Sequence, residues 1–548
     1  MPSDFLPVKP KQRQSLHTRD GVRLDADVYC PEGEGPWPVL LMRQPYGRAI
    51  ASTVVYAHPT WYAAQGYLVV IQDVRGRGTS EGVFDLFAHE REDGYDSVQW
   101  AAQLPHSNGQ VGMYGFSYQG MTQLYAAQTK PAALKALAPA MVGYDLYQDW
   151  AYENGALRLQ AGLGWATQLA AETARLNGNK TAFNALRTAR NLPLSGPVTA
   201  CPDVLKQHAP DSFWHDWLAH PKDNDYWQSL KPNLTGVDLP MLHVGGWFDP
   251  YLTGDIRLFK EMAASQYPQH FWIGPWSHIP WSRNVGDVDF GPGAMNPIDQ
   301  LQIRWFDHWL KGNDAALAHQ PPIHLFEMGS NQWRLFQTWP EGLKSRIYRL
   351  GSSGLAAMRQ DNGALVPPSA KSTASSVVTD VLVHDPWRPV PSLGGHTSFP
   401  SGSFERSALD GRSDVLTYTT DLLETDLAIA GEATVTLHMQ SDASSYDVCA
   451  VLSVVHPDHR VFNLTQGYKR FYGGHAQTIA VPLQPTCFRL TAGQALRLSL
   501  SGACFPAYTV NPGTQTVPLD QVPTMDQHII TLTLHQGTNT VLTLPLSP

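Results

Sequence analysis

The sequence predicts an α/β fold in which a parallel sheet covered by helices is followed by a separate β-sandwich. Up to about Pro139, short apolar runs alternate with helical stretches, which is typical of parallel strands joined by crossover helices. From Tyr144 to about Pro232, helical periodicity rich in aromatic residues and alanine replaces the strand signals. From Ile323 onward, strand-like runs recur between prolines and glycines, as expected of a β-sandwich.

These changes of pattern divide the chain of 548 residues into three regions. We expect residues 1–143 and 239–318 to form the sheet domain. Residues 144–238 are expected to form a helical cap inserted into that domain, and residues 319–548 are expected to form the sandwich, with Pro321-Pro322 near the boundary. The length and the hydrophobic content of 43% suffice for two or three domains.

A serine lies at the tip of a predicted strand, turn and helix. The apolar run Val111 to Tyr114 leads into Gly115-Phe116-Ser117-Tyr118-Gln119-Gly120, and the uncharged run Met121 to Gln128 reads as a buried helix. This is the geometry of a nucleophile elbow, although Gly120 lies one position later than in the common G-x-S-x-G. Because a lone Gly-x-Ser run is more often an ordinary loop, the interpretation depends on residues further along the chain.

Two further polar residues each follow a predicted strand. Leu239 to Val244 leads to Asp249, and Phe271 to Pro275 leads to His278. Serine, aspartate and histidine in this chain order, each just past a strand, match the catalytic triad of α/β-hydrolases. In such a triad the imidazole takes the serine proton and the carboxylate orients the imidazole. Alone, Asp249 could be a turn residue and His278 a loop histidine, but their joint placement favours the triad.

A phenol is the predicted side-chain donor to an oxyanion. The strand-like run Val39 to Met42 leads to Tyr46, at the position where related folds often carry a glycine-rich oxyanion loop, and no such loop occurs here. The Tyr46 hydroxyl, paired with the backbone N–H of Tyr118 after the nucleophile, could serve instead. The alternative is that Tyr46 is a surface-loop aromatic.

At this point the chain resembles a known family, the bacterial cocaine esterase and X-prolyl dipeptidyl-peptidase group, also called CocE/NonD hydrolases. The matching motifs span most of the chain: Pro45-Tyr46, Asp73 to Gly82, Glu92 to Asp96, Gly115 to Gly120, Gly246 to Asp249, Gly274 to His278, His384 to Pro386 and Phe505-Pro506. The resemblance implies an α/β-hydrolase domain with a C-terminal jelly roll, a serine-hydrolase mechanism, and Tyr46 as the oxyanion tyrosine.

The cap supplies candidates for an acyl pocket. Trp150, Tyr152 and Trp165 lie in the helical region between the serine and the aspartate, where hydrolases of this type accept a cap. The alternative is that these three aromatic residues form the core of the cap itself.

The preferred function is hydrolysis of neutral acyl esters. Family members that act on α-amino acid esters carry extra carboxylates just after the catalytic aspartate, because a buried ammonium must be paired. Here Pro250, Tyr251 and Leu252 offer no charge. The cap carboxylates that could supply one are Asp145, Asp149 and Glu153, for which a solvated helix face is the favoured interpretation. The alternatives are an X-prolyl dipeptidyl-peptidase or α-amino acid ester hydrolase of the same fold, and a non-catalytic carbohydrate-binding protein.

Composition narrows the partners. The net charge of -9 disfavours nucleic acid or an anionic membrane as a partner, and no apolar run reaches membrane-spanning length. Met1 to Arg19 lacks the apolar core of a secretory signal, and the five scattered cysteines indicate a reducing cytoplasm. We expect no metal and no cofactor, since pairs such as His456 and His459 lack a companion ligand set. A small-molecule ester is the expected partner, and the sequence leaves a homo-oligomer open.

Overall fold

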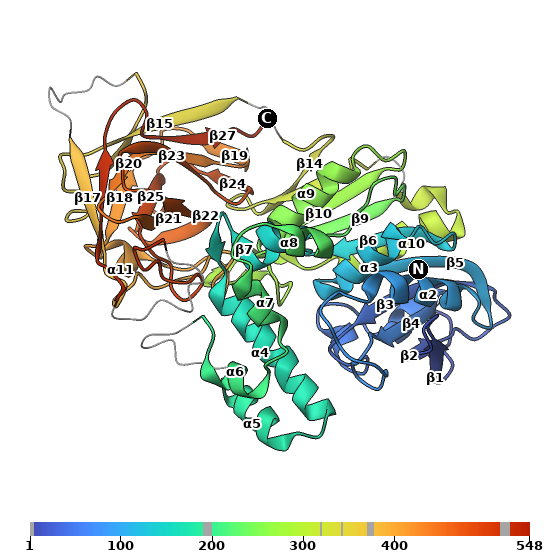
Figure 1. Cartoon of the computed structure of the whole chain (residues 1–548). Helices are drawn as coiled ribbons and strands as arrows, with labels where there is room; N and C mark the ends of the chain where they lie inside the picture. Colours follow the sequence, from blue (N-terminus) through green and yellow to red (C-terminus); the bar gives the residue numbers. More distant parts are fainter. Residues whose placement is uncertain (1–4, 190–199, 318–319, 341–343, 370–377, 516–525) are drawn as a thin grey trace.

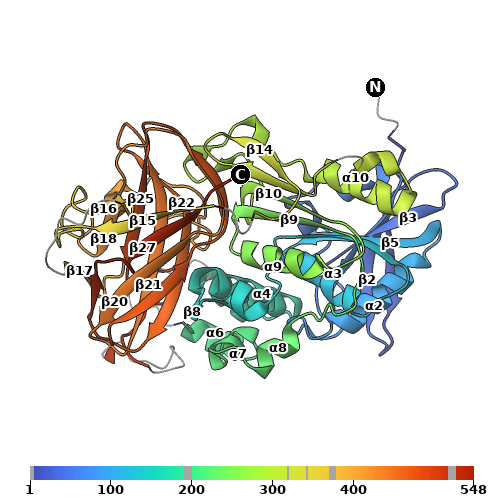
Figure 2. The same ribbon diagram turned by 90° about the horizontal axis from the view of Figure 1, so that it is seen from above.

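The computed structural model describes residues 5–189, 200–317, 320–340, 344–369, 378–515 and 526–548. A sheet domain lies beside a β-sandwich, and a helical cap extends from between them (Figures 1 and 2). Both the α/β-hydrolase domain and the C-terminal β-sandwich predicted from the sequence are confirmed. The predicted boundary at residues 318–319 lies outside the described residues.

The described residues of the hydrolase domain form a sheet of ten strands in which the central strands are parallel. Their order in space is β1 (Gln12–His17), β2 (Arg23–Tyr29), β4 (Leu68–Asp73), β3 (Trp37–Gln44), β5 (Ser107–Phe116), β6 (Leu134–Ala140), β9 (Met241–Phe248), β10 (Gln269–Ser277), β13 (Ile323–Glu327) and β14 (Gln332–Phe336). The parallel strands run from β4 to β13, and their buried apolar residues alternate between the cores on the two faces.

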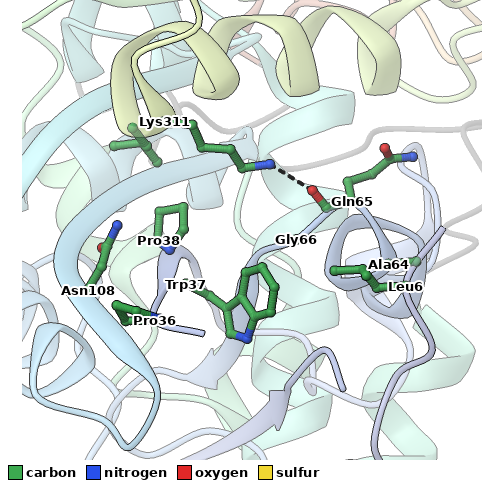
Figure 3. Close-up of a pocket in the computed structure, with 10 residues that line it drawn as sticks. Leu6, Pro36, Trp37, Pro38, Ala64, Gln65, Gly66, Asn108 and Lys311 are labelled. Carbon is green, nitrogen blue, oxygen red and sulfur yellow. Dashed lines mark hydrogen bonds between the residues drawn. The ribbon is translucent and has the colours of Figure 1, made fainter. Parts of the chain in front are cut away.

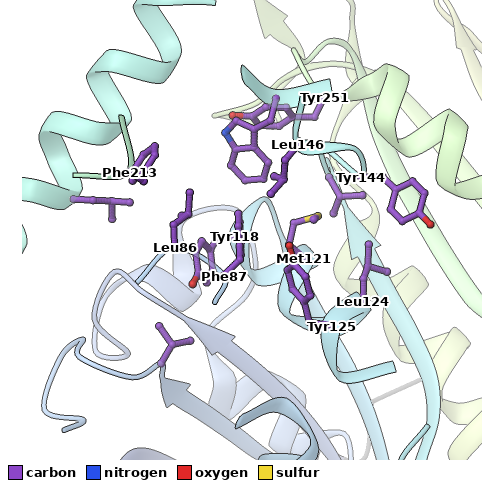
Figure 4. Packing of buried hydrophobic residues seen from close by; sticks show 14 of the residues in the cluster. Leu86, Phe87, Tyr118, Met121, Leu124, Tyr125, Tyr144, Leu146, Phe213 and Tyr251 are labelled. Atoms are coloured by element: carbon purple, nitrogen blue, oxygen red, sulfur yellow. The ribbon is translucent and has the colours of Figure 1, made fainter. Parts of the chain in front are cut away.

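Helices cover both faces of this sheet. One apolar core joins it to α2 (Glu90–Ala102), α3 (Tyr118–Gln128) and α9 (Leu252–Met262). A second core, on the other face, joins it to α1 (Pro59–Ala64) and α10 (Ile298–Lys311). Figure 4 shows part of the first core, where α3 meets the cap.

The strands β13 and β14 depart from the expected domain division. We expected every strand after residue 319 in the sandwich, but β13 pairs in parallel with β10 and β14 pairs with β13, so both extend the hydrolase sheet. The reason is long-range pairing: Ile323–Glu327 is buried along its whole length, which suits the middle of either sheet.

The cap begins with a π-helical segment, Leu146–Ala151, followed by a short hairpin that the sequence did not predict. The hairpin strands are β7 (Tyr152–Glu153) and β8 (Ala156–Leu157). The cap helices are α4 (Leu159–Leu176), α5 (Lys180–Ala189), α6 (Asp203–His208), α7 (Phe213–Ala219) and α8 (Asp225–Leu230).

The sandwich is built mainly of antiparallel pairs and includes one short helix, α11 (Ser407–Asp410). Its described strands are β15 (Ser345–Gly351), β16 (Ala364–Val366), β17 (Thr379–His384), β18 (Val415–Thr419), β19 (Leu427–Gly431), β20 (Thr434–Ser441), β21 (Ser445–Val455), β22 (Val461–Tyr472), β23 (Gln477–Pro482), β24 (Thr486–Leu490), β25 (Ala495–Ser501), β26 (Ile530–His535) and β27 (Val541–Pro545). One continuous apolar core joins it to β9, β10 and β13 of the hydrolase sheet.

A buried carboxylate joins the cap to the sandwich. Glu153 Oε2 accepts hydrogen bonds from Arg158 Nη2 at 2.8 Å and from Tyr508 Oη at 2.6 Å, and lies 3.0 Å from His396 Nε2. Arg158 Nη1 also donates to the carbonyl oxygen of Pro250, the residue after Asp249, at 2.8 Å. The sandwich therefore braces both the cap and the loop of the predicted catalytic aspartate.

We expect Glu153→Ala to destabilise the protein by about 3 kcal/mol, because removing one partner leaves buried charge unpaired. Thermal unfolding followed by circular dichroism would measure this as a lower Tm. The matched control is Glu172→Ala, which breaks an exposed Glu–Arg pair on α4 and should cost less than about 1 kcal/mol. Equal Tm values for the two variants would contradict the bracing role of Glu153.

Candidate active site

The predicted catalytic residues all lie at one edge of the sheet. Ser117 directly follows β5, Asp249 follows β9 and His278 follows β10, while Tyr46 lies two residues beyond β3. Because these strands are parallel and near neighbours, their carboxyl ends meet at the same edge. Residues far apart in sequence are thus brought into one site.

His278 links the serine to the aspartate. Its Nδ1 lies 2.7 Å from Asp249 Oδ1, and its Nε2 lies 3.1 Å from Ser117 Oγ. Asp249 is fully buried and its other oxygen accepts the backbone N–H of Tyr251 at 3.2 Å, which fixes the carboxylate. With a proton on Nδ1 held by Asp249, Nε2 is free to accept the serine proton.

The serine occupies a strained turn between β5 and α3. Its φ of +59° lies in a region that side-chain-bearing residues rarely adopt, so the hydroxyl is presented at the tip of the turn. The neighbouring glycines permit this packing: a Cβ at Gly115 would collide with Gln119, and one at Gly120 would collide with Val142 beyond β6. The close approach of Val142 explains why residue 120 is a glycine.

The Tyr46 hydroxyl lies at the site and is protonated. It accepts a hydrogen bond from Trp165 Nε1 at 3.1 Å and contacts the Ser117 side chain. Burial raises the pKa of Tyr46 to about 12, while the contacts with Trp165, Arg77 and Ser117 act in the opposite direction. At neutral pH the phenol therefore keeps its proton and can donate a hydrogen bond to a negatively charged oxygen.

Tyr118 offers its backbone rather than its side chain. The phenol donates to Glu90 Oε1 at 2.8 Å, and Glu90 in turn pairs with Arg43 at 2.6 Å. These contacts engage the Tyr118 hydroxyl with Glu90, the first residue of α2. As the first residue of α3, Tyr118 has an amide N–H with no acceptor within the helix, which suits it to bind an anion.

The structure brings two of the three predicted cap aromatics to the site. The Trp150 and Trp165 rings lie 5.0 Å apart, and Trp165 contacts Tyr46. Tyr152 instead stacks on Tyr147 at 4.9 Å and donates to the carbonyl oxygen of Trp217 at 3.0 Å, within the cap. For Tyr152 the alternative interpretation holds, because the chain changes from π-helical to extended between it and Trp150.

Aromatic side chains that the sequence did not single out complete the site. The Tyr251 ring packs edge-on against His278 at 5.0 Å and lies 4.5 Å from Trp150. Phe213 of α7 lies 5.1 Å from Trp165, and Figure 4 labels Phe213, Tyr251 and Tyr118 as members of one apolar cluster. In the sequence, the position of Tyr251 directly after Asp249-Pro250 is the signal that places it near the predicted triad.

The cap carboxylates are not a solvated face, contrary to expectation. Asp149 is fully buried and pairs with Arg257 at 3.2 Å. Asp145 accepts the backbone N–H groups of residues 147 and 148 at the start of the π-helical segment, and Glu153 forms the joint described above. All three are committed to partners within the folded protein, and those of Asp149 and Glu153 include residues distant in the sequence.

One cavity in the described residues lies away from this site. It has a volume of about 630 Å³ and is lined by Trp37, Asn108 and Lys311 among others (Figure 3). Trp37 begins β3 and Asn108 lies near the start of β5, so the cavity opens at the opposite edge of the sheet from Ser117. The ammonium group of Lys311, which lines the cavity, donates a hydrogen bond to the carbonyl oxygen of Gln65 at 2.7 Å.

A parallel sheet whose carboxyl edge joins a serine, a histidine and an aspartate, with a cap inserted after the serine, defines a serine hydrolase of the α/β-hydrolase fold. Residues 20–280 match the X-Pro dipeptidyl-peptidase (S15 family), and residues 315–544 match the X-Pro dipeptidyl-peptidase C-terminal non-catalytic domain. The chain is 32% identical to cocaine esterase from Rhodococcus sp. (strain MB1 Bresler), over 90% of this chain and 91% of that protein. It therefore belongs to the CocE/NonD and S15 family of serine hydrolases, as the sequence motifs indicated.

Solved structures agree on the fold. An aminopeptidase from a marine sediment Thaumarchaeota archaeon matches with a TM-score of 0.83 and 23% identity, covering 99% of this chain and 98% of that chain. An α-amino acid ester hydrolase matches with a TM-score of 0.78 and 20% identity, covering 98% of this chain and 96% of that chain. In the described part of the chain, no helix has the length and apolar character needed to cross a bilayer.

We expect Ser117→Ala to abolish turnover of p-nitrophenyl butyrate and labelling by a fluorophosphonate probe, because no other hydroxyl contacts His278 Nε2 among the described residues. Circular dichroism should show an unchanged fold. The matched control is Ser277→Ala, which removes the hydroxyl next to His278 that faces the carbonyl oxygen of Pro280. Wild-type labelling of Ser117→Ala would exclude this serine as the nucleophile.

For Tyr46→Phe we expect kcat to fall by on the order of 10²-fold with little change in KM, because the hydroxyl acts on charge that develops during the reaction. Steady-state kinetics under conditions where acylation limits the rate would measure this. Trp165→Phe is the control, since it removes the N–H that reaches Tyr46 but keeps an aromatic ring. An unchanged kcat in Tyr46→Phe would assign the donor to another residue.

Proposed function

We propose that this protein hydrolyses neutral acyl esters through an acyl-enzyme intermediate on Ser117. The observation that carries the proposal is the position of His278, whose two ring nitrogens contact Ser117 and Asp249 at 3.1 and 2.7 Å. This contact gives the serine a base and the base an orienting carboxylate, which are the requirements of nucleophilic catalysis by a hydroxyl.

The first half of the reaction acylates the serine. Ser117 Oγ attacks the ester carbonyl carbon while His278 Nε2 accepts the hydroxyl proton. The carbonyl oxygen becomes an oxyanion, to which the Tyr46 hydroxyl and the Tyr118 amide donate hydrogen bonds. When the tetrahedral intermediate collapses, His278 returns the proton to the leaving alcohol, and the acyl group remains on the serine.

The second half repeats these steps with water. His278 takes a proton from a water molecule, which attacks the acyl carbon, and the same donors hold the oxyanion. Collapse releases the carboxylic acid and returns the proton to Ser117. We place the acyl group against Trp150, Trp165 and Tyr251, whose rings lie beside the reacting groups and offer an apolar, planar surface.

The arrangement of carboxylates favours a neutral acyl group over one with an α-amino group. An ammonium buried at the site would need an anion to offset its desolvation. Asp145, Asp149 and Glu153 are held by other partners, and the three residues directly after Asp249 carry no charge. An X-prolyl dipeptidyl-peptidase or α-amino acid ester hydrolase, the alternative within the family, would need such an anion.

The setting of the enzyme is also a proposal. We infer that it works in the cytoplasm on a small-molecule ester, because its five cysteines are all free in the structure and disulfides are rare in that compartment. We propose neither nucleic acid nor membrane as a partner, in keeping with the net charge of -9.

We expect an ester of phenylacetic acid to be hydrolysed at least as efficiently as the corresponding ester of phenylglycine, which differs by one α-amino group. Comparison of kcat/KM for the two esters tests this, with Ser117→Ala as the control for spontaneous hydrolysis. A preference for the amine of about tenfold or more, equivalent to roughly 1.4 kcal/mol, would favour the aminopeptidase-like alternative.

A further inference from the structure

A buried arginine beside the oxyanion site lacks an ionic partner. Arg77 follows β4 and is only 1% exposed. Its Nη1 donates to the carbonyl oxygen of Leu169 at 3.2 Å, and its Nε has no hydrogen-bond partner. Among the described residues, no carboxylate lies within ion-pair distance of this guanidinium, whereas Arg43, Arg48 and Arg158 are all buried in ion pairs.

Arg77 contacts residues that lie next to the two expected oxyanion donors, Tyr46 and Tyr118. Leu169, its acceptor, lies one turn along α4 from Trp165, which donates to the Tyr46 hydroxyl. The guanidinium stacks over the Phe84 ring at 3.7 Å, and that ring lies 6.1 Å from the ring of Tyr118. Arg77 is therefore enclosed between the cap helix and the start of α3.

The loop that carries Arg77 is fixed on both sides. A Cβ at Gly76 would collide with the backbone of Phe84, and one at Gly78 would collide with the carboxylate of Asp73. Asp73 is itself held by the backbone N–H and the side chain of Arg48. The sequence motif from Asp73 to Gly82 thus forms a loop that holds the Arg77 guanidinium in a position where its desolvation is unfavourable.

The charge at this position persists at neutral pH. Burial lowers the pKa of Arg77 to about 10, which still leaves the guanidinium protonated. Its field acts on Tyr46, where it lowers the pKa of the phenol and so strengthens the hydroxyl as a donor. The nearby anion on α4, Glu172, pairs with Arg175 at the surface.

We propose that Arg77 is a positioning residue of the oxyanion site, whose unpaired charge strengthens Tyr46 as a donor to the negatively charged tetrahedral intermediate. A preorganised charge near developing negative charge lowers the barrier without reorganisation during the reaction. This role accounts for a buried, unpaired cation, which packing alone would not favour. The inference rests on the proposed function, because it requires an oxyanion to form beside Tyr46.

The test compares a neutral and a charged replacement of Arg77. In Arg77→Met we expect kcat for p-nitrophenyl butyrate to fall by about tenfold while KM changes less than about twofold, because the charge acts on the transition state. Arg77→Lys, which keeps the charge, should restore most of the rate. The matched control is Arg187→Met, which removes a guanidinium that stacks over Phe183 on α5 at the far end of the cap (Figure 1).

A reversible inhibitor distinguishes a loss of oxyanion stabilisation from a general structural effect of the substitution. Butylboronic acid accepts Ser117 Oγ at boron while His278 takes the proton, which leaves an anionic tetrahedral adduct. Its Ki should rise in Arg77→Met by the same factor as kcat falls. A role confined to bracing α4 through Leu169 would instead raise KM or lower Tm without moving kcat and Ki together, and that result would overturn the proposal.

A double-mutant cycle tests whether Arg77 acts through Tyr46. In the Tyr46→Phe background, Arg77→Met should lower kcat by less than about twofold, because the donor is already absent. A full tenfold loss there, or no loss in the wild-type background, would overturn the proposal. If Arg77→Met does not fold, Arg77→Gln replaces it in the same comparisons. Failure of the proposed function is distinguishable, since Ser117→Ala would then keep its activity.

Discussion

Parallel pairing of β3, β5, β9 and β10 is the constraint on which the site depends. The serine and the histidine are 161 positions apart in sequence, yet each needs only to follow its strand directly to reach the same edge of the sheet. The intervening strand β6 contributes no catalytic group, but the residue beyond it, Val142, contacts Gly120 and so shapes the serine turn. Long insertions such as the cap can therefore enter between strands without moving the catalytic residues relative to one another.

The buried charged groups near the site differ in how many polar partners they have, and this difference indicates which of them serve to join the domains. Glu153 has three polar partners from the cap and the sandwich, so its burial is explained by the union of domains. Arg77 has one neutral acceptor, so its burial is not explained in that way. If Arg77 served only to fill space, a Leu or Met of similar volume could replace it with little loss of stability, because an apolar side chain avoids the desolvation penalty of a buried charge. The proposed action of this charge on Tyr46 is the simpler explanation of its presence.

The strands, their order along the chain and the residues that follow them could be predicted, because apolar runs and turn residues are local signals. The sheet to which Ile323–Glu327 belongs could not, since a wholly buried strand fits either domain. The position of the Tyr152 side chain also could not be predicted, because it depends on a change from π-helix to strand two residues after Trp150. Likewise, the spacing of Asp145, Asp149 and Glu153 resembles one face of a helix, but no regular helix spans them.

The same three carboxylates show how substrate preference follows from folding. A carboxylate can pair with a substrate ammonium only if the folded protein leaves it without a stronger partner. In this chain Arg257 and Arg158 occupy Asp149 and Glu153, and the backbone of the π-helical segment occupies Asp145. Beside His278 lies the ring of Tyr251, which in turn packs against the indole of Trp150. Such a surface gains from burying an apolar acyl group but supplies no carboxylate to offset the dehydration of an ammonium. The pairing of residues outside the triad therefore supports the proposed preference for neutral esters.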